Sequence, residues 1–450
     1  MEWFFRPFNR NRFLVLWVSA RPYSSSLDEP ELGYCYSKSL ISRIYQQSKF
    51  SVADFSVQSD YATVSSSPKC SKKQSADVLV LGAGVVGLSL AWELSKRGQN
   101  VIIVEAGQIG RGRGGASSWA GAGILPPAPT KNAIDPLDKL KALSHQVQAD
   151  WARELVESTG IETGYRRCGG IYMALTQGEL ATLVAGEAWW DEHGIQHQRL
   201  SVDELVELEP ALFHGERNDI KGGWLLPDEC QIRNPHLLQA LHAACVAAGV
   251  QVLEDCEVVN LERNPEGRVT AILTTDGERH WADQVCICSG AWSIELLKQF
   301  QTPNGLMPVR GQMLLYEFSD PPLSHVINEG NRYLVPRDSG QLLCGSIEEE
   351  VGFEVKTTGA ALDEIRQWAE SVLPMLQEKS VAKSWAGLRP GSYDGIPYLG
   401  SIPGYENLFV ATGHFRSGIH LSCGTAICMA DLITGQESRL DLTPFRVGRG

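Results

Sequence analysis

Three glycines and one glutamate have the spacing of a dinucleotide-binding turn. Gly82, Gly84 and Gly87 form the pattern G-x-G-x-x-G, and Glu105 follows the first glycine by 23 residues. The first glycine permits a tight turn, the second lets the backbone approach a pyrophosphate, and the third lets a helix pack closely on a strand. An acid at this distance accepts hydrogen bonds from a ribose 2′-hydroxyl. The pattern predicts a dinucleotide site, but it does not separate NAD from FAD.

The residues that flank this turn predict the elements that must position it. An apolar strand is expected at residues 78–81, a helix from about 85 to 97, and a second strand at 101–104. The N–H groups at the start of the helix and its positive dipole end are expected to face the phosphates. The complete strand–helix–strand unit makes the prediction specific, because the glycine pattern alone is a weak signal.

Further segments favour a flavin over a nicotinamide. A small-residue loop at 111–127 lets backbone N–H groups lie along a pyrophosphate, and Ser117 and Ser118 offer hydroxyls to phosphate or ribitol. A helix at about 235–248 precedes strands that end in a small-residue turn at 289–292, as suits a ligand crevice at the carboxyl edge of a sheet.

The C-terminal region predicts a second helix start that faces the ligand. Residues 387–400 read GLRPGSYDGIPYLG, a strand is expected at 408–411, and a helix begins near Ser417 after a turn. The start of this helix would face an anionic or electron-rich group, and a reduced flavin is such a group. A distant segment that closes over a ring suits a flavin, which argues against a nicotinamide-dependent dehydrogenase.

These motifs together resemble those of the D-amino-acid oxidase superfamily of FAD-dependent amine oxidoreductases, and most closely its glycine oxidase branch. The glycine-rich turn, GLRPG, DGIPYLG and GHFRSGI carry the resemblance, which covers residues 76–450. It implies an α/β fold, in which a Rossmann-like FAD-binding domain of the GR2 type holds an inserted α+β substrate domain built on an antiparallel sheet. The FAD-binding domain would comprise about 76–130, 231–300 and 385–440, and the substrate domain about 135–230 and 305–384.

The resemblance also implies the residues that bind the substrate. Arg389 of GLRPG would bind the substrate carboxylate, which suits the bidentate fork of a guanidinium. Tyr333 would contact the same carboxylate, and Arg416 of GHFRSGI would lie near the flavin and the substrate. The alternatives are a structural ion pair for Arg389 and packing on a sheet for Tyr333. Ile347 lies near where the family places a side chain that limits substrate size, so the identity of the amine stays open.

The implied FAD contacts come from both ends of the chain. His414, among them, is expected either to tune the flavin or to be structural. The full set is Gly82, Ala83, Gly84, Val85, Val86, Gly87, Glu105, Ala106, Ser117, Ser118, Ala122, Gly123, Ile124, Val258, Gly290, His414, Phe415, Arg416, Ser417, Gly418 and Ile419.

The implied reaction oxidises the C–N bond of glycine, sarcosine or a small D-amino acid. A hydride passes from the α-carbon to flavin N5, the imine product is hydrolysed, and O₂ reoxidises the flavin and yields H₂O₂. FAD is expected to be non-covalent, because no cysteine lies in or just beside 388–400, the region where sarcosine oxidases attach it. A homo-oligomer is compatible with the family. Two alternatives stay open: a dehydrogenase with another electron acceptor, and a non-catalytic FAD-containing assembly factor of an organelle.

The composition of the chain limits its possible binding partners and indicates its location in the cell. The 450 residues carry a net charge of −13, which argues against nucleic acid as a partner. No apolar run reaches the length of a membrane span. Residues 1–75 are set apart by arginines and serines, and a start of this kind predicts a transit peptide to the plastid stroma or mitochondrial matrix, with a disordered tail as the alternative. The first 26 residues contain Arg6, Arg10, Arg12 and Arg21 but one acid, Glu2.

His193 and His197 have the i, i+4 spacing that can place two metal ligands on one helix face. Gly194 weakens a helix at this point, and the sequence offers no evident third ligand. We therefore expect both side chains to be solvated and predict no metal site.

Overall fold

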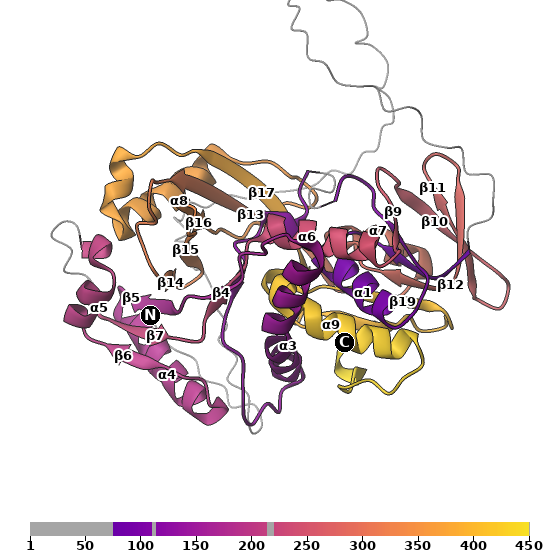
Figure 1. The fold of residues 1–450 in the computed structure, drawn as a ribbon, viewed down its shortest axis with the longest axis horizontal. Helices are drawn as coiled ribbons and strands as arrows, with labels where there is room; N and C mark the ends of the chain where they lie inside the picture. Colours follow the sequence, from indigo (N-terminus) through magenta and orange to yellow (C-terminus); the bar gives the residue numbers. More distant parts are fainter. Residues whose placement is uncertain (1–74, 110–113, 214–219, 450) are drawn as a thin grey trace, which may run out of the picture. The chain divides into compact units, whose positions relative to one another are not determined.

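A sheet of eight strands with a parallel centre carries the glycine-rich turn in the computed structural model, which describes residues 75–109, 114–213 and 220–449 (Figure 1). Residues 1–74, which contain almost all of the predicted transit peptide, lie outside the described residues. The parallel strands are, in spatial order, β19 (Leu408–Thr412), β12 (Arg279–Ile287), β1 (Ser75–Leu81), β2 (Val101–Val104) and β9 (Gln251–Leu253); the antiparallel strands β11 (Val269–Thr274), β10 (Val258–Arg263) and β18 (Tyr398–Ser401) extend them.

The predicted strand–helix–strand unit is confirmed. Helix α1 spans Val85–Lys96, and β2 has the predicted bounds. Along β1, Val78 and Val80 belong to the core on the helical side, whereas Leu79 and Leu81 belong to the core on the opposite side. A strand buried on both faces reads as a continuous apolar run, which is the pattern that predicted it.

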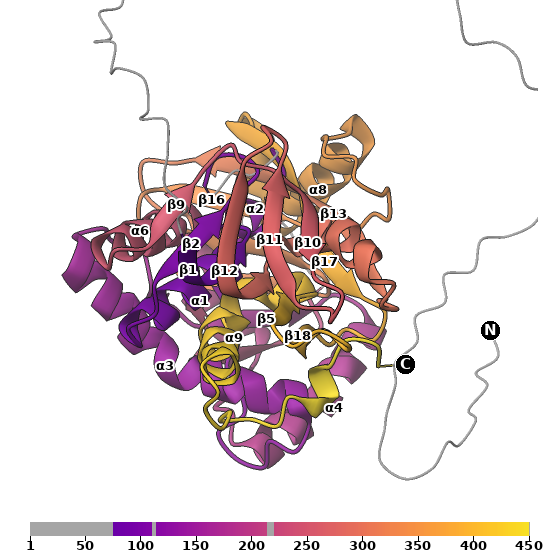
Figure 2. The same cartoon turned by 90° about the vertical axis from the view of Figure 1, so that its right-hand side faces the viewer.

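A layer of helices covers one face of this sheet. Helices α1, α3 (Pro136–Thr159), α6 (Asn234–Ala247) and α9 (Gly418–Ile433) pack on one another, and the rings of Trp92 and Trp151 meet edge to face with centroids 4.9 Å apart. The sequence assigns α3 to the substrate domain, yet its apolar stripe, which includes Leu140 and Leu155, belongs to this core because α9 covers it. Figure 2 looks from the side onto β10, β11 and β12, in which β11 pairs antiparallel with both neighbours.

The second sheet also has eight strands and is antiparallel except where β14 pairs with β5. Helix α8 (Gly359–Val372) packs on the face that presents Leu314 and Tyr316, and Met313 and Leu315 lie in a separate cluster. The predicted FAD-binding segment 385–440 begins inside this sheet, because β17 forms its ladder with β13. The strand order is β17 (Lys383–Ser392), β13 (Leu306–Glu317), β16 (Gln341–Gly345), β15 (Arg332–Pro336), β14 (Val326–Glu329), β5 (Gly170–Ala174), β7 (Gly222–Leu226) and β6 (Gln198–Leu200).

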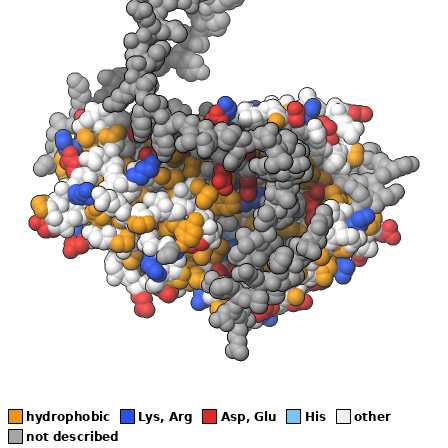
Figure 3. Space-filling view, turned by 180° about the vertical axis from the view of Figure 1, so that it is seen from behind, with side chains coloured by type: hydrophobic (Ala, Val, Ile, Leu, Met, Phe, Trp, Pro, Cys, Tyr) orange, Lys and Arg blue, Asp and Glu red, His pale blue; other side chains and the backbone are white. Residues whose placement is uncertain are grey.

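Short elements complete the fold. Within the described ranges, no helix combines the length and the apolar character needed to cross a bilayer. On the visible part of the face in Figure 3, hydrophobic side chains gather toward the middle, and charged side chains of both signs lie mainly around them. The remaining elements are α2 (Ser117–Ala120), α4 (Gln177–His193), α5 (Val202–Leu208), α7 (Ser293–Leu297) and a small sheet of β3 (Ile124–Leu125), β8 (Cys230–Gln231) and β4 (Arg166–Arg167).

Candidate cofactor and substrate site

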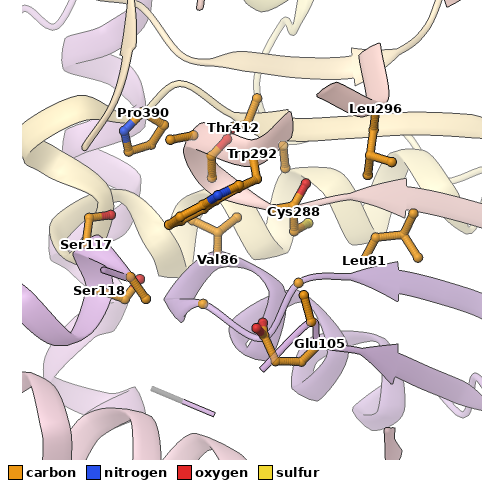
Figure 4. A pocket seen from close by; sticks show the side chains of 18 of the residues that line it. Leu81, Val86, Glu105, Ser117, Ser118, Cys288, Trp292, Leu296, Pro390 and Thr412 are labelled. Atoms are coloured by element: carbon orange, nitrogen blue, oxygen red, sulfur yellow. Dashed lines mark hydrogen bonds between the residues drawn. The ribbon is translucent and has the colours of Figure 1, made fainter. Parts of the chain in front are cut away.

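A cavity opens where the parallel strands end (Figure 4). Its lining includes the last residues of β1, β2 and β19, which are Leu81, Val104 and Thr412. Cys288, which directly follows β12, also lines it. The carboxyl ends of parallel strands share one edge, so segments far apart in the chain meet there. Figure 4 shows Glu105 on the wall opposite Thr412.

Two of the three glycines of the turn have no room for a side chain, and at the third the space is tight. At Gly82, φ is +111° and a Cβ would lie 2.7 Å from the carbonyl oxygen of Cys288. At Gly87, a Cβ would lie 1.9 Å from the carbonyl oxygen of Gly82. Gly84 is the N-cap of α1, and a Cβ there would lie 3.3 Å from Ser118 Oγ. The turn can therefore approach a ligand through its backbone.

Two side chains tie this turn to its neighbours. The Glu105 carboxylate accepts hydrogen bonds from the backbone N–H groups of Ala83 at 2.8 Å and Gly107 at 3.1 Å. Ser118 Oγ accepts the N–H of Val85, at the first turn of α1, at 3.0 Å. These contacts hold the carboxylate at the end of β2, where the sequence predicts the ribose contact, and hold α2 against the start of α1.

The predicted cofactor residues gather around two adjoining cavities. Ala83 and Gly87 line neither cavity but support the turn from behind. The first cavity is lined by Gly82, Gly84, Val85, Val86, Glu105, Ala106, Ser117, Ser118, Val258, Gly290, His414, Phe415 and Gly418; Val85, Ser117, Ser118, Phe415 and Gly418 also line the second, together with Ala122, Gly123, Ile124, Arg416, Ser417 and Ile419.

Arg389 lies in the second cavity, which is partly open to solvent. Its guanidinium donates hydrogen bonds to the carbonyl oxygen of Ile347 at 3.1 Å and to Ser346 Oγ at 2.7 Å. On the neighbouring strand β13, a Cβ at Gly311 would lie 2.4 Å from Arg389 Nη2. Burial lowers the pKa of Arg389, yet arginine stays cationic at neutral pH. The absence of a side chain at Gly311 thus makes room for a fixed cation.

Tyr333 and Arg416 reach the same cavity with different partners. The Tyr333 hydroxyl lies 3.5 Å from Met313 Sδ. Arg416 donates to Asn331 Oδ1 at 2.9 Å and to the Asn331 carbonyl oxygen at 2.8 Å, and it forms an ion pair with Glu348 at 3.1 Å. The structure therefore brings together all three residues predicted to bind substrate, and it occupies the guanidinium of one of them.

A buried acid lies behind the wall of the second cavity. Glu229 accepts hydrogen bonds from the Tyr172 hydroxyl at 2.5 Å and from Asn328 Nδ2 at 3.0 Å, and both donors line the cavity. Within the described ranges, no Lys or Arg side chain forms an ion pair with Glu229. Burial raises the pKa of Glu229 to about 7. The wall therefore rests on a carboxyl group that titrates near neutral pH.

His414 is buried at the first cavity, and its Nε2 lies 3.0 Å from Thr425 Oγ1 on α9. Burial lowers its pKa to about 4. At neutral pH the ring is therefore uncharged. The hydrogen bond to α9 supports the structural alternative for this residue, while its place in the wall keeps it close to any ligand.

The expectation that both histidines of HGIQH are solvated is wrong for His193, and the side chain of His197 is also only 12% exposed. Its side chain is buried and stacks on Trp189 with ring centroids 4.4 Å apart, and Nδ1 lies 2.8 Å from the Trp189 carbonyl oxygen. Gly194, with φ +68°, ends α4, so His197 lies beyond the helix. In the described part of the chain, no group of three or more His, Cys, Asp and Glu side chains is arranged to hold a metal.

Several residues of the two cavities escaped the sequence prediction. Trp292 and Pro390 line the first cavity, and each lies within two residues of a predicted site residue, so the motifs could have indicated them. Gly311 and Met313 of the second cavity give no local signal, because only the pairing of β13 with β17 and β16 brings them there.

Comparisons with known proteins agree with this geometry and confirm the predicted α/β fold. A family model described as FAD dependent oxidoreductase (DAO) matches residues 77–432. The chain is 32% identical over 372 residues to glycine oxidase of Pseudomonas putida, which covers 82% of this chain and 98% of that protein. It is 33% identical over 367 residues to the bifunctional protein ThiO/ThiG of Synechocystis sp., covering 80% of this chain and 52% of that protein.

A solved structure is similar over almost its whole length. The crystal structure of glycine oxidase from Geobacillus kaustophilus superposes with a TM-score of 0.77 at 32% sequence identity. The match covers 84% of this chain and 99% of that chain. The two adjoining cavities therefore lie in a protein that belongs to the DAO family of FAD-dependent oxidoreductases.

Proposed function

We propose that this protein is an oxidase of a small amino acid or amine: glycine, sarcosine or a small D-amino acid. One observation carries the proposal. Arg389 lies in a cavity that adjoins the dinucleotide cavity, and no carboxylate of the described residues lies within ion-pair distance of it. A guanidinium that is removed from water without an anion is costly, and a substrate carboxylate would be its partner. The relatives named glycine oxidase support this choice of substrate.

The first cavity fits FAD. Gly82 and Gly84 line this cavity, where the lack of a side chain leaves the backbone open to a ligand, and the start of α1 faces the same cavity. Glu105 lies at the end of β2, where a ribose hydroxyl would be bound. We propose that FAD is held without a covalent bond, because residues 388–400 contain no cysteine. Denaturation should release all flavin into the soluble fraction, and flavin that stays on the polypeptide would contradict this.

Bound FAD would supply a hydride acceptor for the substrate α-carbon and a route for the electrons to O₂, which would yield H₂O₂. Arg389 would hold the substrate carboxylate in a fork, and the Tyr333 hydroxyl would supply a further donor. Both contacts fix the position of the α-carbon, which is the main contribution that a protein can make to such a step. The substrate leaves as an imine, which water hydrolyses to an oxo acid and ammonia or an amine.

The described lining of the second cavity contains no Asp or Glu that could take a proton from the amine. His414 lines the first cavity with its Nε2 engaged by Thr425, and burial lowers its pKa to about 4. His420 does line the second cavity, but burial lowers its pKa to about 3, so it is a weak base. The side chains therefore favour binding of the neutral amine over deprotonation by a dedicated base. The rate should accordingly rise with pH toward the pKa of the free amine.

The flavin spectrum of the full-length holoenzyme tests the proposal. Glycine, sarcosine and D-alanine are added separately without air, and loss of the oxidised flavin band reports reduction. Bleaching by one of them, reversed by air with H₂O₂ formation, is the expected result. Bleaching that air does not reverse would indicate a dehydrogenase with another acceptor. Bound flavin that no carboxylated amine bleaches would contradict the proposed activity and favour the assembly-factor alternative.

We propose in addition that residues 1–75 direct the protein to an organelle. The four arginines and the single acid of the first 26 residues support import, and the relative from Synechocystis sp. favours the plastid. A fusion of residues 1–75 to a fluorescent protein should enter plastids, and the same fusion with the four arginines changed to glutamate should stay outside. Mitochondrial fluorescence would reassign the organelle, and diffuse fluorescence of the unchanged fusion would contradict import.

A further inference from the structure

Three arginines line the second cavity, and they differ in their acidic partners. Arg332 forms an ion pair with Glu364 at 2.6 Å, and Arg416 forms one with Glu348 at 3.1 Å. Among the described residues, no carboxylate lies close enough to Arg389 to form an ion pair. The cavity thus contains three cationic groups, of which one lacks a counter-ion.

Both Nη atoms of the partly exposed Arg416 guanidinium have partners. Besides Glu348, it donates to the side-chain and backbone oxygens of Asn331, which lies in the turn between β14 and β15. A carboxylate that approached Arg416 from the cavity would have to displace these partners. It would also meet the negative charge of Glu348, which directly neutralises the arginine.

Arg310 holds the segment that carries Glu348 in place through the next residue, Glu349. Arg310, whose side chain is almost completely buried, grips Glu349 with Nε at 2.9 Å and Nη2 at 3.1 Å, and the backbones of the two residues exchange hydrogen bonds. The preceding residues Ser346 and Ile347 are the partners of Arg389. The stretch 346–348 therefore orients the guanidinium of Arg389 and supplies the acidic partner of Arg416.

We infer that Glu348 sets substrate specificity by restricting the site to amines with a single carboxylate. This inference rests on the proposed function, because it names the class of substrate that the same cavity accepts. Arg389 takes the carboxylate next to the reacting carbon. An amine with a second carboxylate finds Arg416 occupied and Glu348 beside it, so it binds weakly. Removal of the Glu348 charge would turn Arg416 into a second carboxylate site.

A direct role of Glu348 in binding the substrate ammonium is less consistent with the geometry. Glu348 is not among the residues that line the cavity, and its Oε1 faces Arg416. An ammonium-binding acid would have to present its oxygens to the cavity. The two roles differ in their consequences, because loss of an ammonium partner weakens every amine, whereas release of Arg416 strengthens only the dicarboxylates.

Two ethers that cannot be oxidised as amines test the inference by binding alone. Methoxyacetate has the shape of sarcosine with one carboxylate, and diglycolate adds a second carboxylate. Calorimetric titration of the holoenzyme at neutral pH should show that the unchanged protein binds methoxyacetate more tightly. In Glu348→Gln, diglycolate affinity should rise roughly tenfold, the effect of one added charge-assisted hydrogen-bond pair, with methoxyacetate affinity within about twofold.

Two further variants localise the effect. Glu262→Gln makes the same charge change at an exposed ion pair with Arg279, and neither residue lines a cavity, so the preference should not change. In the double variant Glu348→Gln/Arg416→Gln, the gain for diglycolate should disappear. A gain that survives without Arg416 would overturn the inference.

The remaining outcomes are also decisive. Equal affinities of the unchanged protein for the two ethers would overturn the inference without any variant, even if Glu348→Gln failed to fold. Weaker binding of methoxyacetate in a folded Glu348→Gln protein would assign Glu348 to another role. Preferential binding of methoxyacetate by a protein that oxidises no amine would refute the proposed function and keep the inferred specificity. With an active enzyme, Glu348→Gln should raise turnover of iminodiacetate relative to sarcosine.

Discussion

The two adjoining cavities are built from different materials. The first is made largely of backbone at strand ends, with glycines where a ligand must come close, and its central unit is continuous in the chain. The second depends on side chains, above all Arg389, that are oriented by partners from other segments. Cofactor binding therefore depends mainly on the course of the backbone, whereas substrate binding depends on a few charged side chains held in position. Single substitutions should therefore impair FAD binding and substrate binding independently.

The largest effect is expected from Gly87→Ala, which attacks the backbone of the first cavity. The new Cβ would lie 1.9 Å from the carbonyl oxygen of Gly82, and neither atom can move without displacing the turn. We expect FAD affinity to fall more than about 100-fold, with a cost of several kcal/mol in stability. The flavin-to-protein ratio and the melting temperature measure this. Gly359→Ala at the start of α8, where a Cβ meets nothing within 4 Å, is the control. Full flavin content in Gly87→Ala would contradict the dependence of FAD binding on the backbone of this turn.

Arg389→Met should leave the first cavity intact and disable the second. Loss of a charge-assisted fork predicts a KM for a carboxylated amine that is roughly 100-fold higher, while the flavin content stays that of the unchanged protein. Steady-state kinetics and flavin absorbance give the two readings. Arg279→Met removes the same charge from an exposed ion pair and should do neither. A KM that does not change in Arg389→Met would remove Arg389 from the substrate site.

Gly311→Ala tests whether the cation must be placed as well as present. Its Cβ would lie 2.4 Å from Arg389 Nη2, so the guanidinium must shift. We expect KM to rise roughly tenfold with a smaller change in kcat and no loss of flavin. In a Gly311→Ala/Arg389→Met double variant the glycine change should add nothing, since the group that it displaces is gone. Additive effects would show that Gly311 acts independently of Arg389.

The smallest effect is expected from Glu229→Gln behind the wall of the second cavity. The pKa of Glu229 is raised to about 7 when folded, above its ordinary value of 4.5, so the folded protein binds a proton that the unfolded chain releases. Its contribution to stability is therefore greatest in acid and is lost as pH rises from about 4.5 through 7. Glu229→Gln should be more stable than the unchanged protein at pH 8 by about 1–2 kcal/mol, and the difference should vanish at about pH 4, below the ordinary pKa of 4.5.

Urea unfolding at the two pH values measures this difference. The glutamine keeps an acceptor for the Tyr172 hydroxyl or for Asn328, so the wall should keep its shape. Flavin content should not change. A Glu229→Gln protein that is less stable than the unchanged protein at pH 8 would show that the ionised carboxylate is favourable where it lies.

The local parts of the fold were predictable because their causes are local. The bounds of β2 agree with the prediction, and α1 ends within one residue of it, since apolar runs, a glycine stop and a glycine turn lie next to one another. The domain limits are less accurate. Residues 385–392 and helix α3 contact sheets or cores other than those expected, because strand pairing and helix packing are decided by segments far away in the chain.

By itself, the sequence determined the dinucleotide turn, a helix start near Ser417, one residue from that of α9, and the identity of the cation at Arg389, because each depends on a short run of residue types. Only the tertiary structure decided which charges are free. Arg416 and Arg389 look alike in the sequence, yet Glu348 and Asn331 occupy the first, and the ladder of β13 with β17 places Gly311 beside the second. The physical reason is that the charge available to a ligand depends on partners in space, and these come from strands that pair across long stretches of chain.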